Sequence, residues 1–79
     1  MNYEELVLNL LSDITGQEPE ELKEIKDVNL FTSGVVDSLS ISSLIAEAEE
    51  ALDKKIELTK YSAEDFATIN KIISVLEDL

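Results

Sequence analysis

A serine stands in the run Asp37-Ser38-Leu39, at a position where a phosphate ester would be stabilised. Gly34 precedes it as a turn signal, and Asp37 is a good N-cap because its carboxylate can accept free amide hydrogens of a first helical turn. The Ser38 hydroxyl would then be exposed at a helix N-terminus, which carries partial positive charge. A phosphate ester on Ser38 would therefore be electrostatically favourable at this position.

The residue types that most enzymes use are missing from this chain, which has no Cys and no His. Their absence argues against a thiolate nucleophile, an imidazole base, a disulfide and a zinc site. A serine hydrolase needs a base beside its nucleophile, and the sequence supplies no convincing one. The acidic run between Glu18 and Glu24 lacks the spacing of a calcium loop. We therefore predict no metal site and no enzymatic activity.

The charge is strongly unbalanced, with 18 acidic against 6 basic residues and a net charge of −12. This charge repels phosphate backbones and anionic membrane surfaces, so we expect neither nucleic-acid binding nor membrane insertion. It would attract proteins with basic patches, although acidic residues also simply keep small domains soluble. No apolar run could span a membrane and no signal-peptide pattern opens the sequence, so a cytoplasmic location is expected.

Three segments have helical periodicity: residues 2–15 with Gly16 as stop signal, residues 38–52, and residues 69–79 with Thr68 as N-cap. In the first, Leu8 lies off the apolar stripe. The second is expected to bury one row of apolar residues: Ile41, Leu44, Ile45, Ala48, Ala51 and Leu52.

Two further stretches connect these segments. Residues 62–65 have capping-box spacing and predict a short helical turn, with Tyr61 and Phe66 pointing inward. Residues 16–36 form a long loop with a possible short helix starting at Pro19. Its expected anchors are apolar: Leu22, Ile25, Val28, Leu30, Phe31, Val35 and Val36. The fold class is therefore all-α, a small four-helix bundle of three longer helices and a short third one, in a single domain over residues 1–79.

Leu39 is a large apolar residue on the polar face of the second long helix, beside Ser38. A single exposed Leu is common, so alone it favours a stray surface residue. The functional alternative is a contact point for a partner that binds this end of the helix.

The pattern Leu30-Phe31-x-x-Gly34-x-x-Asp37-Ser38-Leu39, followed by an acidic amphipathic helix, resembles the acyl and peptidyl carrier proteins. The resemblance covers most of the chain, including Phe66-Ala67-Thr68-Ile69 at the start of the last helix. It implies that a phosphopantetheinyl transferase moves 4′-phosphopantetheine from coenzyme A onto Ser38. The thiol of that arm would carry an acyl or aminoacyl group as a thioester, which agrees with the absence of Cys.

The resemblance also implies a set of partners: the transferase, an acyl- or aminoacyl-loading ligase, and a downstream synthase or transferase. It also implies a partner-binding face on the outer side of the second long helix, formed by Leu39, Ser42, Ala46, Glu49, Glu50 and Asp53. The carrier itself is expected to be a monomer. Ser42, Ser43 and Ala46 stand where fatty-acid carriers often have apolar or acidic side chains. We therefore expect a specialised carrier of the polyketide, nonribosomal-peptide or D-alanyl type. The alternatives are a general fatty-acid acyl carrier protein and an unmodified acidic interaction module.

Overall fold

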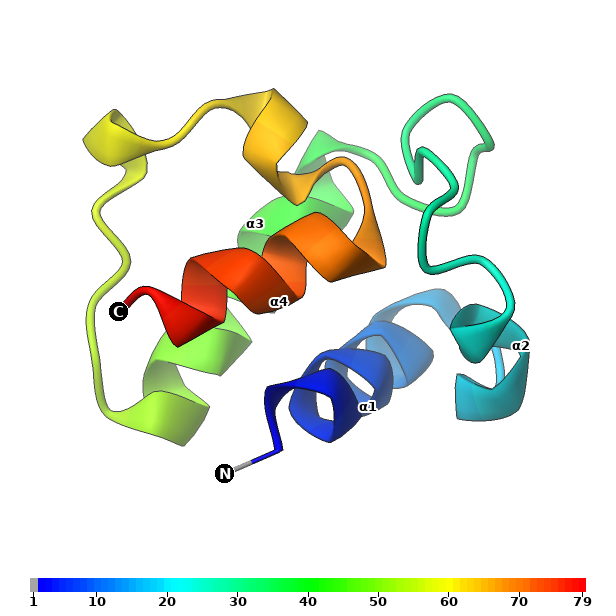
Figure 1. The fold of residues 1–79 in the computed structure, drawn as a ribbon, viewed down its shortest axis with the longest axis horizontal. Helices are drawn as coiled ribbons and strands as arrows, with labels where there is room; N and C mark the ends of the chain where they lie inside the picture. The colour runs from blue at the N-terminus through cyan, green and yellow to red at the C-terminus, as the bar shows by residue number, and fades with distance from the viewer. Residues whose placement is uncertain (1) are drawn as a thin grey trace.

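Four α-helices make up the frame of the computed structural model, which describes residues 2–79. They are α1 (Tyr3–Thr15), α2 (Pro19–Lys23), α3 (Ser38–Leu52) and α4 (Ile69–Glu77), and 3-10 turns at Leu58–Lys60 and Ala63–Phe66 lie between α3 and α4. Helix α1 packs against each of the other three helices (Figure 1). No strand occurs within residues 2–79, so the predicted all-α bundle is confirmed.

Helix α1 begins and ends at the residues that the sequence indicates. The Asn2 side-chain oxygen accepts a hydrogen bond from the Glu5 amide at 3.0 Å. At the other end Gly16 takes the left-handed conformation, with φ of 78°, and its amide donates to the Ser12 carbonyl at 2.9 Å. A residue without a Cβ adopts this conformation at little cost, which explains why the helix ends there.

Leu8 is buried, with 3% of its surface exposed, although it was predicted to lie off the apolar stripe of α1. Helix α2 folds back against that side of α1, and Pro19 and Lys23 lie around the same surface hollow as Leu8. The buried face of α1 is therefore wider than a single stripe, because the long loop covers part of what would otherwise be solvent-exposed.

The core is built entirely from apolar side chains, and no buried polar or charged residue occurs among residues 2–79. Each fully buried aliphatic side chain contributes about 1.5–3 kcal/mol from apolar burial. The largest such side chains come from all four helices and from the long loop: Val7, Leu11, Leu22, Leu30, Leu44, Ile69 and Leu76. This packing replaces the disulfides and metals on which many domains of this size depend.

Two residues predicted to be buried are exposed. Val28 is 40% exposed, because the loop turns outward there, with the Val28 amide bonded back to the Ile25 carbonyl. Ala51 is also exposed. Viewed down the axis of α3, Ala51 lies about 60° to one side of Ala48, and Leu52 lies to the other side. Ala51 is therefore at the edge of the buried stripe. The predictions for both residues were wrong.

The chain between α3 and α4 contains the predicted turn. The Ser62 amide donates to the Asp65 carboxylate at 2.8 Å, which is the reciprocal bond of a capping box. Phe66 is buried and Tyr61 is half-buried, and their rings meet edge to face with centroids 6.1 Å apart. Thr68 then caps α4 by accepting from the Lys71 amide at 3.1 Å.

Candidate functional site

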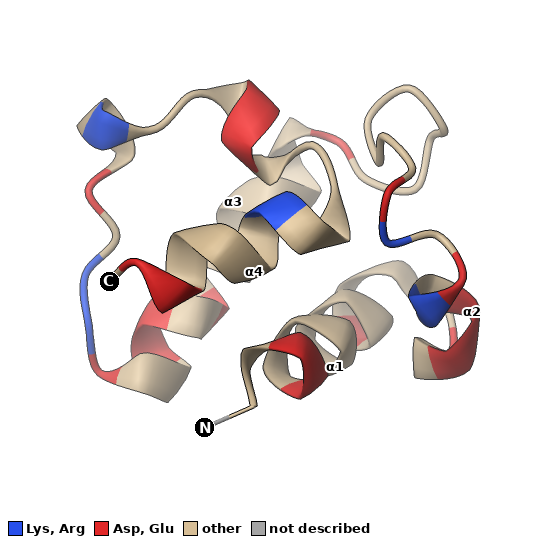
Figure 2. Ribbon diagram, viewed as in Figure 1, with Lys and Arg blue, Asp and Glu red and all other residues tan. Residues whose placement is uncertain are grey.

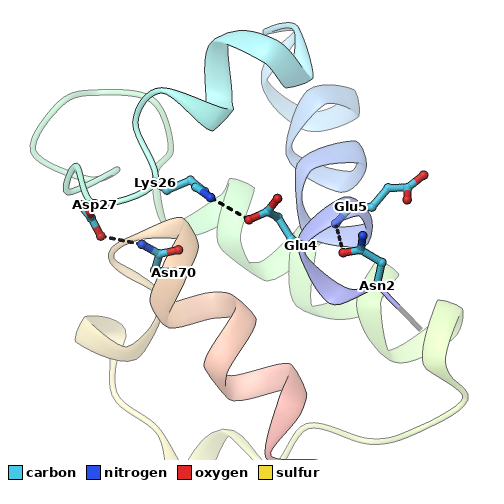
Figure 3. Close-up of polar contacts among 6 residues, drawn as sticks. All are labelled: Asn2, Glu4, Glu5, Lys26, Asp27 and Asn70. Carbon is cyan, nitrogen blue, oxygen red and sulfur yellow. Dashed lines mark hydrogen bonds and ion pairs between the residues drawn. The ribbon is translucent and has the colours of Figure 1, made fainter.

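The loop before α3 is pinned to two helices. Lys26 pairs with Glu4 of α1 at 2.8 Å, and the Asn70 side chain of α4 donates to the Asp27 carboxylate (Figure 3). Backbone bonds reinforce these contacts, since the Asn70 amide donates to the Lys26 carbonyl at 3.2 Å. The long loop is thus a fixed support for the start of α3.

A second set of hydrogen bonds closes the loop just before Asp37-Ser38-Leu39, the predicted attachment run. The Asn29 side chain accepts from the amides of Phe31 and Thr32 at 2.9 and 3.0 Å. Leu30, which is fully buried, donates its amide to the Ala67 carbonyl at 2.6 Å and accepts from the Val36 amide at 3.1 Å. These bonds bring Val36 back beside Leu30 and hold the backbone that leads into Asp37.

Asp37 is the N-cap of α3, as predicted. Its backbone is extended, and its carboxylate accepts from the Ser40 amide at 2.8 Å. Hydrogen bonding from Ser40 lowers the pKa of Asp37 below its ordinary value. The cap therefore stays ionised at neutral pH and satisfies one of the free amide hydrogens of the first turn.

Ser38 is the first residue of α3 and is exposed. Among the contacts of residues 2–79, no side-chain hydrogen bond engages its hydroxyl. Beside it lies a pocket of about 260 Å³, bordered mainly by apolar and aromatic groups. The pocket is lined by Phe31, Ser38, Ile41, Ile45, Leu58, Tyr61, Ser62, Ala63 and Phe66.

The outer face of α3 is exposed at five of its six predicted positions. Leu39 is 79% exposed, and Ser42, Ala46, Glu50 and Asp53 are also exposed. Figure 2 shows acidic residues at the C-terminal end of α3, followed directly by lysines in the chain that leaves it. An apolar residue next to Ser38 and negative charge further along thus lie on one helix.

Glu49 departs from the prediction. It is half-buried, and its carboxylate accepts a hydrogen bond from the Ile56 amide at 2.7 Å. The expectation that Glu49 lies exposed on the outer face of α3 was therefore wrong. The helical period alone could not reveal this contact, because it depends on how the chain turns after α3.

Leu58 was missed in the sequence. It is 57% exposed and lines the pocket across from α3. One signal was available, because Leu58 is a large apolar residue in a short, mostly charged stretch that includes Lys54, Lys55 and Glu57. A single exposed Leu is common, so this signal alone could not have identified Leu58 as part of the pocket.

The residues around Ser38 fit a phosphopantetheine group. A free, exposed hydroxyl at the start of a fifteen-residue helix places an attached phosphate near unpaired amide hydrogens. The adjoining apolar pocket offers a surface for the rest of the arm. Within residues 2–79 no helix has the length and apolarity needed to cross a bilayer. The same residues contain no group of three acidic side chains placed to hold a metal ion.

Comparison with known proteins agrees with this geometry. The family model described as "Phosphopantetheine attachment site" matches residues 5–76. The D-alanyl carrier protein of Staphylococcus saprophyticus is 35% identical over 79 residues, which cover 100% of this chain and 99% of that protein. Both findings confirm the predicted carrier family, the covalent 4′-phosphopantetheine cofactor and the thioester-carrying role. The chain belongs to the phosphopantetheine-attachment family of carrier proteins.

Proposed function

We propose that Ser38 is the residue that bears the 4′-phosphopantetheine. The observation that carries the proposal is the position of its exposed hydroxyl at the capped start of α3, beside the apolar pocket. Other serines lack this combination. Ser40 is half-buried and its amide already bonds to Asp37, while the Ser33 hydroxyl donates to the Leu30 carbonyl at 3.3 Å.

Each residue of the attachment run has a separate role in this proposal. Asp37 fixes the first turn of α3, so that the hydroxyl of Ser38 points to solvent and is accessible to a transferase. The Ser38 oxygen attacks the phosphorus that carries the pantetheine in coenzyme A and forms a phosphodiester. The P–O bond of the pyrophosphate breaks, 3′,5′-ADP leaves, and the Ser38 proton passes to a base of the transferase. The bound arm then supplies the thiol that holds the cargo.

The protein presents its cargo and leaves the chemistry to partner enzymes. The residues that line the pocket include no lysine or carboxylate that could act as a base toward Ser38. We infer that a phosphopantetheinyl transferase, a loading ligase and a downstream transferase act on the chain in turn. Leu39, exposed beside Ser38, gives these partners an apolar contact, and Glu50 and Asp53 add negative charge.

We propose that the cargo is a D-alanyl group. The first support is the D-alanyl carrier protein that matches this chain along its whole length. The second is the set of small residues Ser42, Ser43 and Ala46 on α3, at positions where fatty-acid carriers often have apolar or acidic side chains.

A two-stage mass measurement tests attachment and cargo. The protein is first incubated with coenzyme A and a broad-specificity phosphopantetheinyl transferase, and we expect one phosphopantetheine per chain. The modified protein is then offered D-alanine, L-alanine or a long-chain fatty acid with the matching ligases, and we expect loading with D-alanine. Loading with the fatty acid alone would contradict the proposed cargo.

Two serine variants serve as matched controls. Ser38→Ala should abolish the adduct, whereas Ser40→Ala, two residues along the same helix, should retain it. Leu39→Ala should form the adduct more slowly, because it removes an apolar contact and leaves the hydroxyl in place. An adduct on the Ser38→Ala protein would refute the proposed attachment site.

A further inference from the structure

Glu49 connects α3 to the chain that follows it. Its carboxylate accepts from the Ile56 amide at 2.7 Å, across seven residues of sequence. Its backbone carbonyl accepts from the amides of Asp53 and Lys54, the latter at 3.2 Å. One residue near the end of the helix therefore fixes the chain at three points as it turns away.

The segment held in this way leads directly to one wall of the pocket. After Asp53, which takes the left-handed conformation, the chain runs without regular structure along one side of the molecule (Figure 1). Ile56 is the buried residue of this stretch, with 3% of its surface exposed. Leu58 and Tyr61, which line the pocket, follow it by two and five residues.

The opposite wall of the pocket has a different kind of support. Ser38, Ile41 and Ile45 all come from α3, whose backbone is held by its own helical hydrogen bonds. The position of Leu58 relative to that wall depends on where the chain leaves Ile56, whereas Tyr61 also packs edge to face against buried Phe66. The bond between Glu49 and Ile56 is thus the polar tie between the two walls.

We propose that Glu49 is a positioning residue, whose carboxylate holds residues 56–61 against α3 and thereby sets the width of the pocket beside Ser38. The inference rests on the proposed function in one respect, namely that the pocket serves the group attached to Ser38. The role of Glu49 depends on a hydrogen-bond acceptor at the right reach, whereas a docking role would depend on its charge.

Two conservative substitutions separate reach from charge. Glu49→Gln removes the charge and keeps a carbonyl oxygen at the same distance along the side chain, so it can still accept from the Ile56 amide. Glu49→Asp keeps the charge and is one methylene shorter. Glu49→Ala removes both, and Glu47→Ala is the control, because Glu47 is an exposed residue of the same helix.

Amide hydrogen exchange on the unmodified protein gives the first readout. We expect the Ile56 amide to exchange about tenfold faster in E49A and E49D, while it stays near the wild-type rate in E49Q and E47A. Amides in the middle of α1 should change little, since the effect is local. An unchanged Ile56 rate in both E49A and E49D would overturn the proposal.

Kinetics of phosphopantetheine transfer give the second readout. A general loss of stability would not reproduce the order of KM values that we expect among the variants. We expect the KM for the carrier to rise in E49A and E49D and to remain near wild type in E49Q. If E49Q and E49A have the same raised KM while E49D behaves as wild type, Glu49 acts by its charge and the proposal is wrong. Hydrogen exchange is measured on the unmodified protein, so its result does not depend on attachment at Ser38. Failure of the Glu49 proposal is therefore distinguishable from failure of the proposed attachment site.

Discussion

The two connectors that flank α3 are built in opposite ways. Residues 24–37, before the helix, are tied to α1 through the pair of Lys26 with Glu4 and to α4 through Asp27 and Asn70. They also contain Leu30, which is fully buried. Residues 53–62, after the helix, are held mainly by buried Ile56 and its bond to Glu49, with one exposed contact in which Lys54 donates to the Leu79 carbonyl at 3.3 Å.

This difference divides the site into a fixed part and an adaptable part. The attachment run lies at the end of the well-anchored connector, so the position of Ser38 is set before any partner arrives. The far wall of the pocket belongs to the second connector, which exposes Leu58. A carrier that must fit several enzymes would gain from this arrangement, because a fixed attachment point can be combined with a surface that adjusts.

Truncation of one leucine in each connector tests the comparison most strongly. Leu30→Ala should lower the free energy of unfolding by about 2–5 kcal/mol, because it removes a fully buried side chain and leaves a cavity. Leu58→Ala should change it by less than about 0.5 kcal/mol, because its side chain is mostly exposed. Urea unfolding of both variants measures the two values.

The same experiment contains its own check. If the two leucines differ only in burial, the slope of the free energy of unfolding against urea concentration should be the same for wild type and both variants. Equal losses of stability from Leu30→Ala and Leu58→Ala would show that the second connector is as firmly packed as the first, and the proposed division would then be wrong.

The local signals in the sequence were sufficient to predict the long helices and the residues at which they begin or end. Asp37, Gly16 and Thr68 act through side chains or φ angles that depend on their nearest neighbours, and all three cap or end helices as predicted. The carrier family was also visible, because its pattern lies in one continuous run that ends at Leu39.

The errors at Leu8 and Glu49 share a physical cause, which is contact between different segments of the chain. Leu8 is covered by α2, and Glu49 is bonded to a residue beyond the end of its own helix. Helical periodicity describes one face of one helix and carries no information on what lies against the others. The pocket between α3 and Leu58 could not be predicted from the sequence for the same reason.

Two residues with positive φ offer a second test, of moderate size. Gly34 in the first connector has φ of 81°, and no atom lies within 4 Å of a Cβ built on it. Gly34→Ala should therefore destabilise the protein by about 1–2 kcal/mol through backbone strain alone. Asp53, with φ of 53°, already carries a side chain in this conformation at the start of the second connector.

Asp53→Gly should change the free energy of unfolding by less than about 0.5 kcal/mol, because relief of strain is offset by the greater backbone entropy of glycine in the unfolded chain. Gly34→Asn is the control for the first connector and should cost less than Gly34→Ala, since Asn tolerates left-handed backbone better. Thermal unfolding ranks the variants. A Gly34→Ala protein as stable as wild type would show that this connector adapts.

Acid should weaken the first connector through its two bonded carboxylates, and this is the smallest effect that we expect. The hydrogen bond and charge of Lys26 lower the pKa of Glu4, and hydrogen bonding from Ser40 lowers the pKa of Asp37. At a pH between the lowered pKa values of the folded protein and the ordinary pKa values of the unfolded chain, near pH 4, the unfolded chain binds more protons than the folded protein. The stability that these groups contribute is thus present above about pH 4 and is lost as the pH falls through their folded values.

Because a net charge of −12 repels itself, protonation of the other acidic residues opposes this loss, so the test compares slopes between variants. Asp37→Asn keeps a capping side chain and removes the titration, and Lys26→Met removes the partner of Glu4. The free energy of unfolding of both variants should fall less steeply than that of wild type as the pH is lowered from about 4 to 2. Asp13→Asn, an exposed position on α1, is the control. Parallel curves for all four proteins would mean that acid does not act on the connector that positions Ser38.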